Sequence, residues 1–259
     1  MNTSTESDFQ GRSAIVTGAG SGIGRAVALA LAERGAKVLA VDINPDAAKE
    51  TVSLSQGEIV AHRADVSQSE DVRDYAAAAT SLHGFPTIFF NNAGIEGVHR
   101  SIADTSEDDW LRTVGVNLNG VFWGLKHVLP LMRQAGSGAV VNTGSILSLK
   151  GAPDRSDYVA TKHAVLGLTR TAASEVAKDG IKVNCICPGP VDTPLMTRSE
   201  ILVNPGDPSY ERNRFEQGTP AGRYATTAEI AELVLFLLRP DITYLTGTAV
   251  NIDGGIMAV

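Results

Sequence analysis

The chain has 259 residues, with 22 Lys and Arg against 29 Asp and Glu, and a net charge of −7 at pH 7. This acidic balance excludes the basic surface on which binding to nucleic acid or anionic membranes depends. The apolar runs are far shorter than the roughly 20 residues that a membrane helix needs. We therefore expect one domain over residues 1–259, with no nucleic-acid or membrane partner.

The N-terminal residues predict a cytoplasmic protein, and the two cysteines give no indication of a metal site. Residues 1–10 are polar and acidic and lack the apolar centre of a secretory signal, so we expect a short flexible N-terminus and a cytoplasmic protein. Cys185 and Cys187 lie in an apolar run with no further metal ligands near them in the sequence. A zinc site would need such ligands. We therefore predict buried thiols and no metal site.

Seven apolar segments of strand length recur along the chain, with helix-period segments between them. Several are apolar at consecutive positions, which is typical of strands covered by helices on both faces. This alternation predicts an α/β fold, a single-domain, Rossmann-type, doubly wound parallel sheet whose ligands bind beyond the carboxyl ends of the strands. The predicted strands span residues 14–17, 37–41, 58–61, 87–90, 139–142, 182–187 and 249–252.

A long segment, residues 188–220, interrupts this alternation before a helix that begins near Thr226. The segment is rich in Pro, Gly, Thr and charged residues, which predicts irregular structure. An irregular stretch of this length inside a compact domain is usually functional and often forms a lid. We predict a substrate lid around residues 190–220.

The first predicted strand runs into a glycine-rich loop, residues 17–24, which a helical stretch follows at once. Glycines let such a loop turn tightly and approach a pyrophosphate, whose charge is stabilised at the helix N-terminus. Ile23 occupies the position of the third glycine in the common dinucleotide pattern. The alternative is that these glycines serve the backbone turn alone.

Asp42 ends the second predicted strand, eighteen residues beyond Gly24. A carboxylate there accepts hydrogen bonds from the adenine ribose hydroxyls and repels a 2′-phosphate, so NAD is favoured over NADP. Alternatively, Asp42 caps the turn before Asn44. Arg25, beside the glycine loop, leaves NADP as a second alternative, since a basic side chain there could meet a phosphate.

The sequence resembles the short-chain dehydrogenase/reductase family over nearly the whole chain, because a series of motifs occurs in the order and spacing of that family. The glycine pattern Thr-Gly-x-x-x-Gly-Ile-Gly is unbroken in residues 17–24. The other motifs are Asp65-Val66, Asn91-Asn92-Ala93-Gly94, Asn117, Ser145, Tyr158-x-x-x-Lys162, Pro188-Gly189 and Thr193.

The resemblance implies a set of cofactor contacts and a homotetramer. Asp65 and Val66 would contact adenine, and Val191 and Thr193 the nicotinamide carboxamide. Alternatively, Asp65 is a turn residue and the Asn-Asn-Ala-Gly run only ends a strand. The predicted cofactor-binding residues are Gly18, Ser21, Gly22, Ile23, Gly24, Asp42, Ile43, Asp65, Val66, Asn92, Gly94, Tyr158, Lys162, Pro188, Gly189, Val191 and Thr193.

Tyr158 and Lys162 lie four residues apart in a helical pattern, so their side chains share one face. Oxidation of an alcohol by hydride transfer needs a base for the hydroxyl proton, and a nearby ammonium favours tyrosinate. Ser145 follows the fifth predicted strand, where it can hold the substrate oxygen. Asn117 would complete a proton path by family resemblance. Alternatively, Tyr158 and Lys162 form a surface pair.

These residues predict an oxidoreductase that transfers hydride between NAD(H) and a secondary alcohol or ketone. The alternatives are an NADPH-dependent carbonyl reductase of the same fold and a non-catalytic NAD(H)-binding protein. The expected substrate contacts are Ser145, Leu147, Arg155 and Tyr158.

The sequence leaves two alternatives for the charge of the substrate. Arg155, with Arg198, Arg212 and Arg214 in the predicted lid, could bind an anionic group. Alternatively these arginines are solvated or pair with nearby carboxylates. The five histidines have no spacing typical of a metal site or triad and are interpreted as ordinary surface or packing residues.

Overall fold

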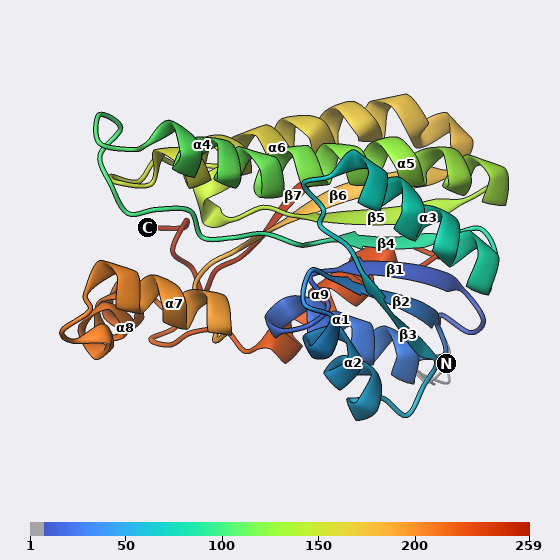
Figure 1. Ribbon diagram of the computed structural model, residues 1–259, viewed down its shortest axis with the longest axis horizontal. Coiled ribbons are helices and arrows are strands. Elements are labelled where there is room, and N and C mark those ends of the chain that lie inside the picture. Colours follow the sequence, from blue (N-terminus) through green and yellow to red (C-terminus); the bar gives the residue numbers. More distant parts are fainter. Residues whose placement is uncertain (1–7) are drawn as a thin grey trace.

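The computed structural model describes residues 8–259, which form one seven-stranded parallel sheet flanked by helices (Figure 1). The strand order is β3-β2-β1-β4-β5-β6-β7, and every neighbouring pair is parallel. This confirms the predicted doubly wound sheet. The strands are β1 (Ser13–Thr17), β2 (Lys37–Asp42), β3 (Ile59–Arg63), β4 (Ile88–Asn91), β5 (Gly138–Thr143), β6 (Ile181–Pro188) and β7 (Ala249–Ile252).

Helices cover both faces of the sheet (Figure 1). One face carries α1 (Gly22–Glu33), α2 (Pro45–Leu54) and α9 (Thr227–Leu238). The other carries α3 (Ser69–His83), α4 (Glu107–Val114), α5 (Gly120–Ala135) and α6 (Ser156–Val176). Residues 8–259 also contain three short turns, the π-helical η2 (Gly115–Asn119) and the 3₁₀-helical η3 (Ile146–Ser148) and η4 (Ala177–Asp179).

Strand β1 shows why consecutive apolar residues predict this architecture. Val16 packs into the core beside α1 and α9, whereas Ile15 packs into the core beside α3 and α5. Both side chains are fully buried. Because successive strand residues point to opposite faces, a strand buried on both sides is apolar at consecutive positions over most of its length.

The segment predicted to be irregular contains two helices, α7 (Pro194–Val203) and α8 (Pro208–Gly218), so that prediction was wrong. Each begins with Pro at its first position. Thr193 caps α7 by accepting a hydrogen bond from the backbone of Met196, and Asp207 caps α8 in the same way. The Pro and Thr that indicated a loop therefore mark helix starts. Both helices project beyond the carboxyl edge of the sheet, close to the C-terminus (Figure 1).

The predicted flexible N-terminus falls mainly on residues 1–7, which lie outside the described residues. Phe9 is fully buried in the core, so the packed part of the chain begins before residue 11. Within residues 8–259, no helix combines the length and the apolar character needed to cross a membrane.

Candidate active site

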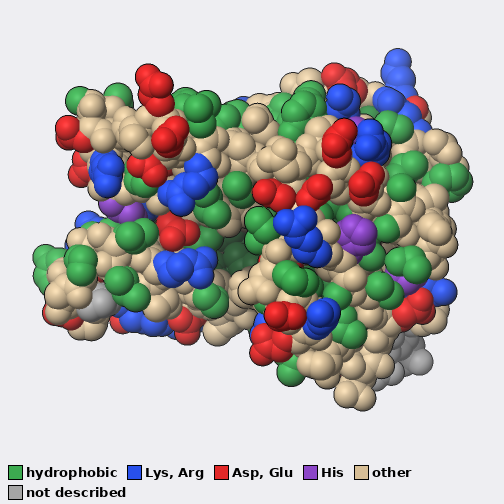
Figure 2. Space-filling view, in the orientation of Figure 1, with side chains coloured by type: hydrophobic (Ala, Val, Ile, Leu, Met, Phe, Trp, Pro, Cys, Tyr) green, Lys and Arg blue, Asp and Glu red, His purple; other side chains and the backbone are tan. Residues whose placement is uncertain are grey.

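A cavity of about 1190 Å³ lies over the carboxyl ends of the strands. Figure 2 shows the surface hollowed near the middle of this face. Residues at the ends of β1, β2, β4, β5 and β6 line the cavity, together with residues of α7. The sheet order reverses between β1 and β4, and such a switch point opens a crevice in doubly wound sheets.

The glycine loop leaves a cradle at the start of α1. The side chain of Ser21 does not cap the helix, so its first N–H groups remain available to an acceptor. Gly18 and Gly22 have φ of 66° and 52°, which favours glycine. A Cβ on Gly24 would lie 2.0 Å from the carbonyl oxygen of Gly18. This close approach of the helix to the loop fits the cradle for a pyrophosphate.

Asp42 holds its carboxylate at the edge of the cavity through two backbone donors. One oxygen accepts the N–H of Gly20 at 2.8 Å and the other that of Asn44 at 2.9 Å. Each oxygen keeps a lone pair, so the turn interaction and a ribose interaction are compatible. Arg25 instead donates to Glu50 and to the carbonyl of Gly20, both at 2.5 Å, and is not among the residues that line the cavity.

The predicted cofactor residues lie on this cavity with one exception. Gly24 is covered by the loop, where its lack of a side chain allows the contact with Gly18. Asn92 joins three strand ends, because its amide donates to the carbonyl of Thr17 at 3.0 Å and accepts the hydroxyl of Thr143 at 3.0 Å. The remaining predicted residues that line the cavity are Gly18, Ser21, Gly22, Ile23, Asp42, Ile43, Asp65, Val66, Gly94, Tyr158, Lys162, Pro188, Gly189, Val191 and Thr193.

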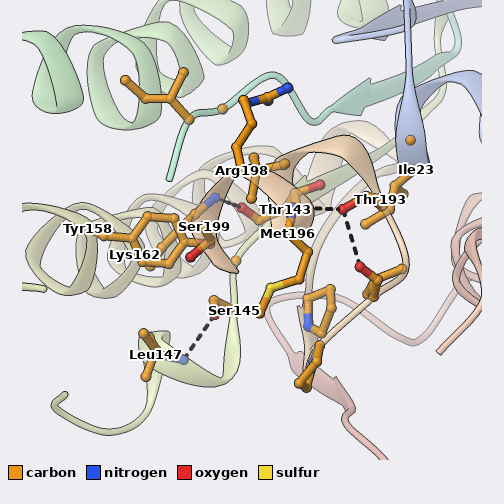
Figure 3. A pocket seen from close by; sticks show the side chains of 18 of the residues that line it. Ile23, Thr143, Ser145, Leu147, Tyr158, Lys162, Thr193, Met196, Arg198 and Ser199 are labelled. Atoms are coloured by element: carbon orange, nitrogen blue, oxygen red, sulfur yellow. Dashed lines mark hydrogen bonds between the residues drawn. The ribbon is translucent and has the colours of Figure 1, made fainter. Parts of the chain in front are cut away.

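Tyr158 and Lys162 project from α6 into the same cavity (Figure 3). The ammonium of Lys162 donates to the carbonyl oxygen of Thr143 at 2.8 Å and lies 5.4 Å from the centroid of the Tyr158 ring. Lys162 is only 4% exposed. The carbonyl at the end of β5 therefore fixes a largely desolvated cation beside the phenol, and the sequence pattern gave no sign of this contact.

Ser145 starts the short turn η3 and is 8% exposed. Its hydroxyl oxygen accepts the N–H of Leu147 at 3.1 Å, and the hydroxyl of Ser148 accepts the N–H of Ser145 at 3.1 Å. This reciprocal capping fixes the turn. The O–H hydrogen of Ser145 stays free to donate into the cavity, which Leu147 also lines.

Asn117 lies in the π-helical turn η2 and is fully buried. Its side chain accepts the N–H of Ile95 and donates to the carbonyl oxygen of the same residue, both at 2.8 Å. Asn117 is absent from the cavity lining. Single π-helical turns often occur at functional sites. Here the turn brings the amide against the loop after β4, behind Gly94.

Asp157, directly before Tyr158, is a fully buried carboxylate. One of its oxygens accepts the hydroxyl of Thr113 at 2.8 Å and the N–H of Val98 at 3.1 Å, and the other accepts the N–H of Tyr158 at 2.7 Å. Asp157 thus connects α4 and the loop after β4 to the start of α6. Sequence reasoning missed this role, because its partners are far apart in the chain.

Arg155 reaches across the cavity wall to three residues in two elements, the loop after β4 and α7. Its guanidinium donates to the carbonyl oxygen of Glu96 at 3.0 Å, to Nε2 of His99 at 2.8 Å and to the hydroxyl of Ser199 in α7 at 3.4 Å. Desolvation and the positive charge of Arg155 lower the pKa of His99 from 6.5 to about 4. His99 lines the cavity. The interpretation of His99 as an ordinary surface or packing residue was therefore incomplete.

The other three arginines all pair with carboxylates. Arg198 lies 3.6 Å from Glu96. Arg214 lies 2.6 Å from Glu211, and Arg212 lies 3.0 Å from Asp192 and 3.4 Å from Glu216. Of the two alternatives for these arginines, the structure favours pairing.

The chain matches the family described as enoyl-(acyl carrier protein) reductase over residues 18–257. It is 41% identical to levodione reductase of Leifsonia aquatica over 252 residues, which cover 95% of this chain and 94% of that protein. It is 39% identical to cyclohexanol dehydrogenase of an Acinetobacter species over 250 residues, which cover 95% of each. A crystal structure of levodione reductase superposes with a TM-score of 0.95, at 40% identity, covering 97% of this chain and 99% of the other. With this match over almost its full length and the glycine loop, Ser145, Tyr158 and Lys162 on one cavity, the chain belongs to the short-chain dehydrogenase/reductase family of oxidoreductases.

Proposed function

We propose that the protein is an NAD(H)-dependent oxidoreductase that interconverts a secondary alcohol and its ketone, with a cyclic, uncharged substrate as the preferred class. The observation that carries this proposal is the shared cavity, which runs from Asp42 and the glycine loop to Ser145, Tyr158 and Lys162. The reaction balances as alcohol plus NAD⁺ giving ketone, NADH and one proton. Bound NAD(H) supplies the hydride acceptor or donor.

The side chains divide the remaining chemistry among them. Tyr158 removes the hydroxyl proton during oxidation and returns it to the ketone oxygen during reduction. Lys162 favours the ionised phenol, since its ammonium lies beside the ring. Ser145 donates a hydrogen bond to the substrate oxygen. Asn117 positions the loop after β4 through Ile95.

The substrate class is supported by the pocket and by two relatives. Ile146, Leu147, Leu195 and Met196 give the substrate end of the cavity an apolar lining, and Arg198 and Arg214 there are paired with carboxylates. The relatives are named for levodione reduction and cyclohexanol oxidation. A ring without charge suits such a pocket better than a carboxylate, whose desolvation would be costly.

Incubation with cyclohexanol, levodione and an acyclic ketone, each with NAD(H) and NADP(H), tests the proposal by the absorbance of reduced nicotinamide. We expect turnover of the cyclic compounds with NAD(H). Preference for NADPH would support the carbonyl-reductase alternative. Binding of NADH without any turnover would support the non-catalytic alternative.

We also propose a homotetramer. The stretch 160–173 of α6 presents small exposed side chains, including Ala160 and Gly167, and Phe122 of α5 is 43% exposed. Small residues allow helices of two subunits to approach closely. Residues 256–259, Ile-Met-Ala-Val, form an apolar tail, and its Val259 is 96% exposed and offers a second contact.

A further inference from the structure

We infer that Arg155 is a second cation, beside Lys162, that stabilises Tyr158 in its ionised form, and so acts on catalysis as a positioning residue through Tyr158. The guanidinium carbon lies 5.0 Å from the centroid of the Tyr158 ring, and the ammonium of Lys162 lies 5.4 Å from the same point. The inference rests on the proposed role of Tyr158 as acid and base.

The guanidinium is a desolvated charge without a counter-ion. Burial lowers the pKa of Arg155, and its Nε is buried without a hydrogen-bond partner. Its two terminal nitrogens contact neutral groups, the carbonyl of Glu96, the imidazole of His99 and the hydroxyl of Ser199. Within residues 8–259, no carboxylate forms an ion pair with Arg155. Holding an unpaired cation in such a place is costly, so it fits a site where negative charge develops.

Tyrosinate fits this requirement better than an anionic substrate group does. A bidentate carboxylate needs two free N–H donors in a fork. Both terminal nitrogens of Arg155 already donate, and Nε, which would complete a side-on pair, is shielded from solvent. The phenol of Tyr158, by contrast, is in place before any substrate arrives.

Other charged groups surround the pair. Lys162 and Asp157 face it from α6, and Asp154 from the turn before that helix. Glu96 and His99 face it from the loop after β4. Arg198 of α7 is paired with Glu96, and Glu211 of α8 acts on His99. The negative members of this set all act from beyond ion-pair distance, so the guanidinium keeps net positive charge beside the ring.

Difference titration measures the ionisation of Tyr158 directly. The tyrosinate absorbance of the intact protein minus that of Tyr158→Phe gives the contribution of this one side chain. The same difference is measured for Arg155→Met against the double variant Arg155→Met/Tyr158→Phe. We expect Tyr158 to ionise at a pH higher by about one unit without Arg155, which is a tenfold change in the equilibrium. If Tyr158 ionises at the same pH with and without Arg155, the inference is overturned.

Arg155→Lys and Arg100→Met are the matched variants. Arg155→Lys keeps the positive charge but loses the planar guanidinium. Tyr158 should therefore ionise at nearly the same pH as in the unaltered protein. The side chain of Arg100 is 57% exposed, lies in the same loop as His99 and pairs with Asp109, so its replacement should leave the titration unchanged. If Arg155→Met does not fold, Arg155→Gln, which keeps a planar amide donor for the carbonyl of Glu96, takes its place.

The pH profile of kcat/KM for alcohol oxidation provides a second readout. Loss of Arg155 should displace the profile to higher pH and lower kcat/KM about tenfold at neutral pH. A uniform loss at every pH would indicate a structural role only, and a loss confined to carboxylated substrates would indicate substrate binding; either overturns the inference. A titration shift in a protein that turns over no alcohol would instead leave the inference standing and defeat the proposed function.

Discussion

The carboxylate of Asp42 accepts a hydrogen bond from the N–H of Gly20 at 2.8 Å, so the acidic residue that ends β2 and the glycine loop that follows β1 form one rigid unit. Asp42→Ala should weaken NADH binding about tenfold to a hundredfold, since a charge-assisted hydrogen bond contributes about 1.5–3 kcal/mol. The same change removes repulsion of a 2′-phosphate and should narrow the preference over NADPH. Fluorescence titration of both nucleotides measures these changes. Asp46→Ala, which removes an exposed carboxylate outside the cavity, is the control. Tighter binding of NADPH by the unaltered protein would contradict the prediction.

Tyr158→Phe should lower kcat at least a hundredfold and leave NADH binding nearly unchanged, because only the proton-carrying hydroxyl is lost. Lys162→Ala should impair both, since the ammonium lies beside the ring and lines the cofactor end of the cavity. Steady-state kinetics and NADH titration separate the two effects. Tyr244→Phe, at a fully exposed tyrosine, is the control. Substantial kcat in Tyr158→Phe would require another base.

Gly167→Glu should dissociate the proposed tetramer without unfolding the subunit. A Cβ at Gly167 meets no atom within 4 Å, so the single chain has room for the new side chain. Between two subunits the charges would repel each other and occupy the space that close packing needs. Light scattering should give a mass of four chains for the unaltered protein and a lower mass for the variant. Lys49→Glu, on the exposed surface of α2, places a glutamate away from this helix face, with a larger change in net charge (−2 against −1), and should leave the mass unchanged. A monomer mass for the unaltered protein would refute the tetramer.

His99 should make the protein less stable in mild acid. Its pKa falls from 6.5 to about 4 on folding, chiefly through desolvation and next through the charge of Arg155. The unfolded chain therefore binds the additional proton first. The free energy of unfolding that is present above pH 6.5 should fall as the pH drops from there toward 4. Chemical denaturation at several pH values should show a weaker decrease for His99→Gln, with His163→Gln as the matched loss of an imidazole. Parallel curves for His99→Gln and the unaltered protein would exclude this coupling.

Local patterns predicted the sheet because each strand carries its own signal. The residues of β1 and β6 are buried along their whole length. In β1 the consecutive apolar residues 14–16 indicate this directly, whereas β6 also buries Lys182 and Asn184 between its apolar residues. The predicted strand bounds lie within two residues of those observed, and the largest difference is at the end of β3. The helices α7 and α8 were not predicted, because their apolar periodicity is weak and the prolines at their first positions are also typical of loops.

The candidate site likewise contains residues that local sequence predicts and residues that only the folded structure reveals. Tyr158 and Lys162 are recognisable because their spacing within one helix is a local property. The pairing of Arg155 with His99 joins residues 56 apart, and it depends on how the loop after β4 meets α6 and α7. No periodicity or spacing encodes such a contact. The structural role of Asp157 was equally unpredictable, because it depends on hydrogen bonds from the backbone of Val98 and the hydroxyl of Thr113, which are distant in the chain.

The strand order also bears on how the protein is made. Strand β1 lies between β2, which follows soon after it, and β4, which pairs Ile88 with Ala14. Until the chain has been synthesised beyond β4, one edge of this central apolar strand has no partner, and open edges of this kind invite aggregation. Pairing of strands so distant in the chain is slow. The cavity spans both sides of β1, so nascent chains should gain no stability from a bound nicotinamide nucleotide, which should stabilise only the completed protein by mass action.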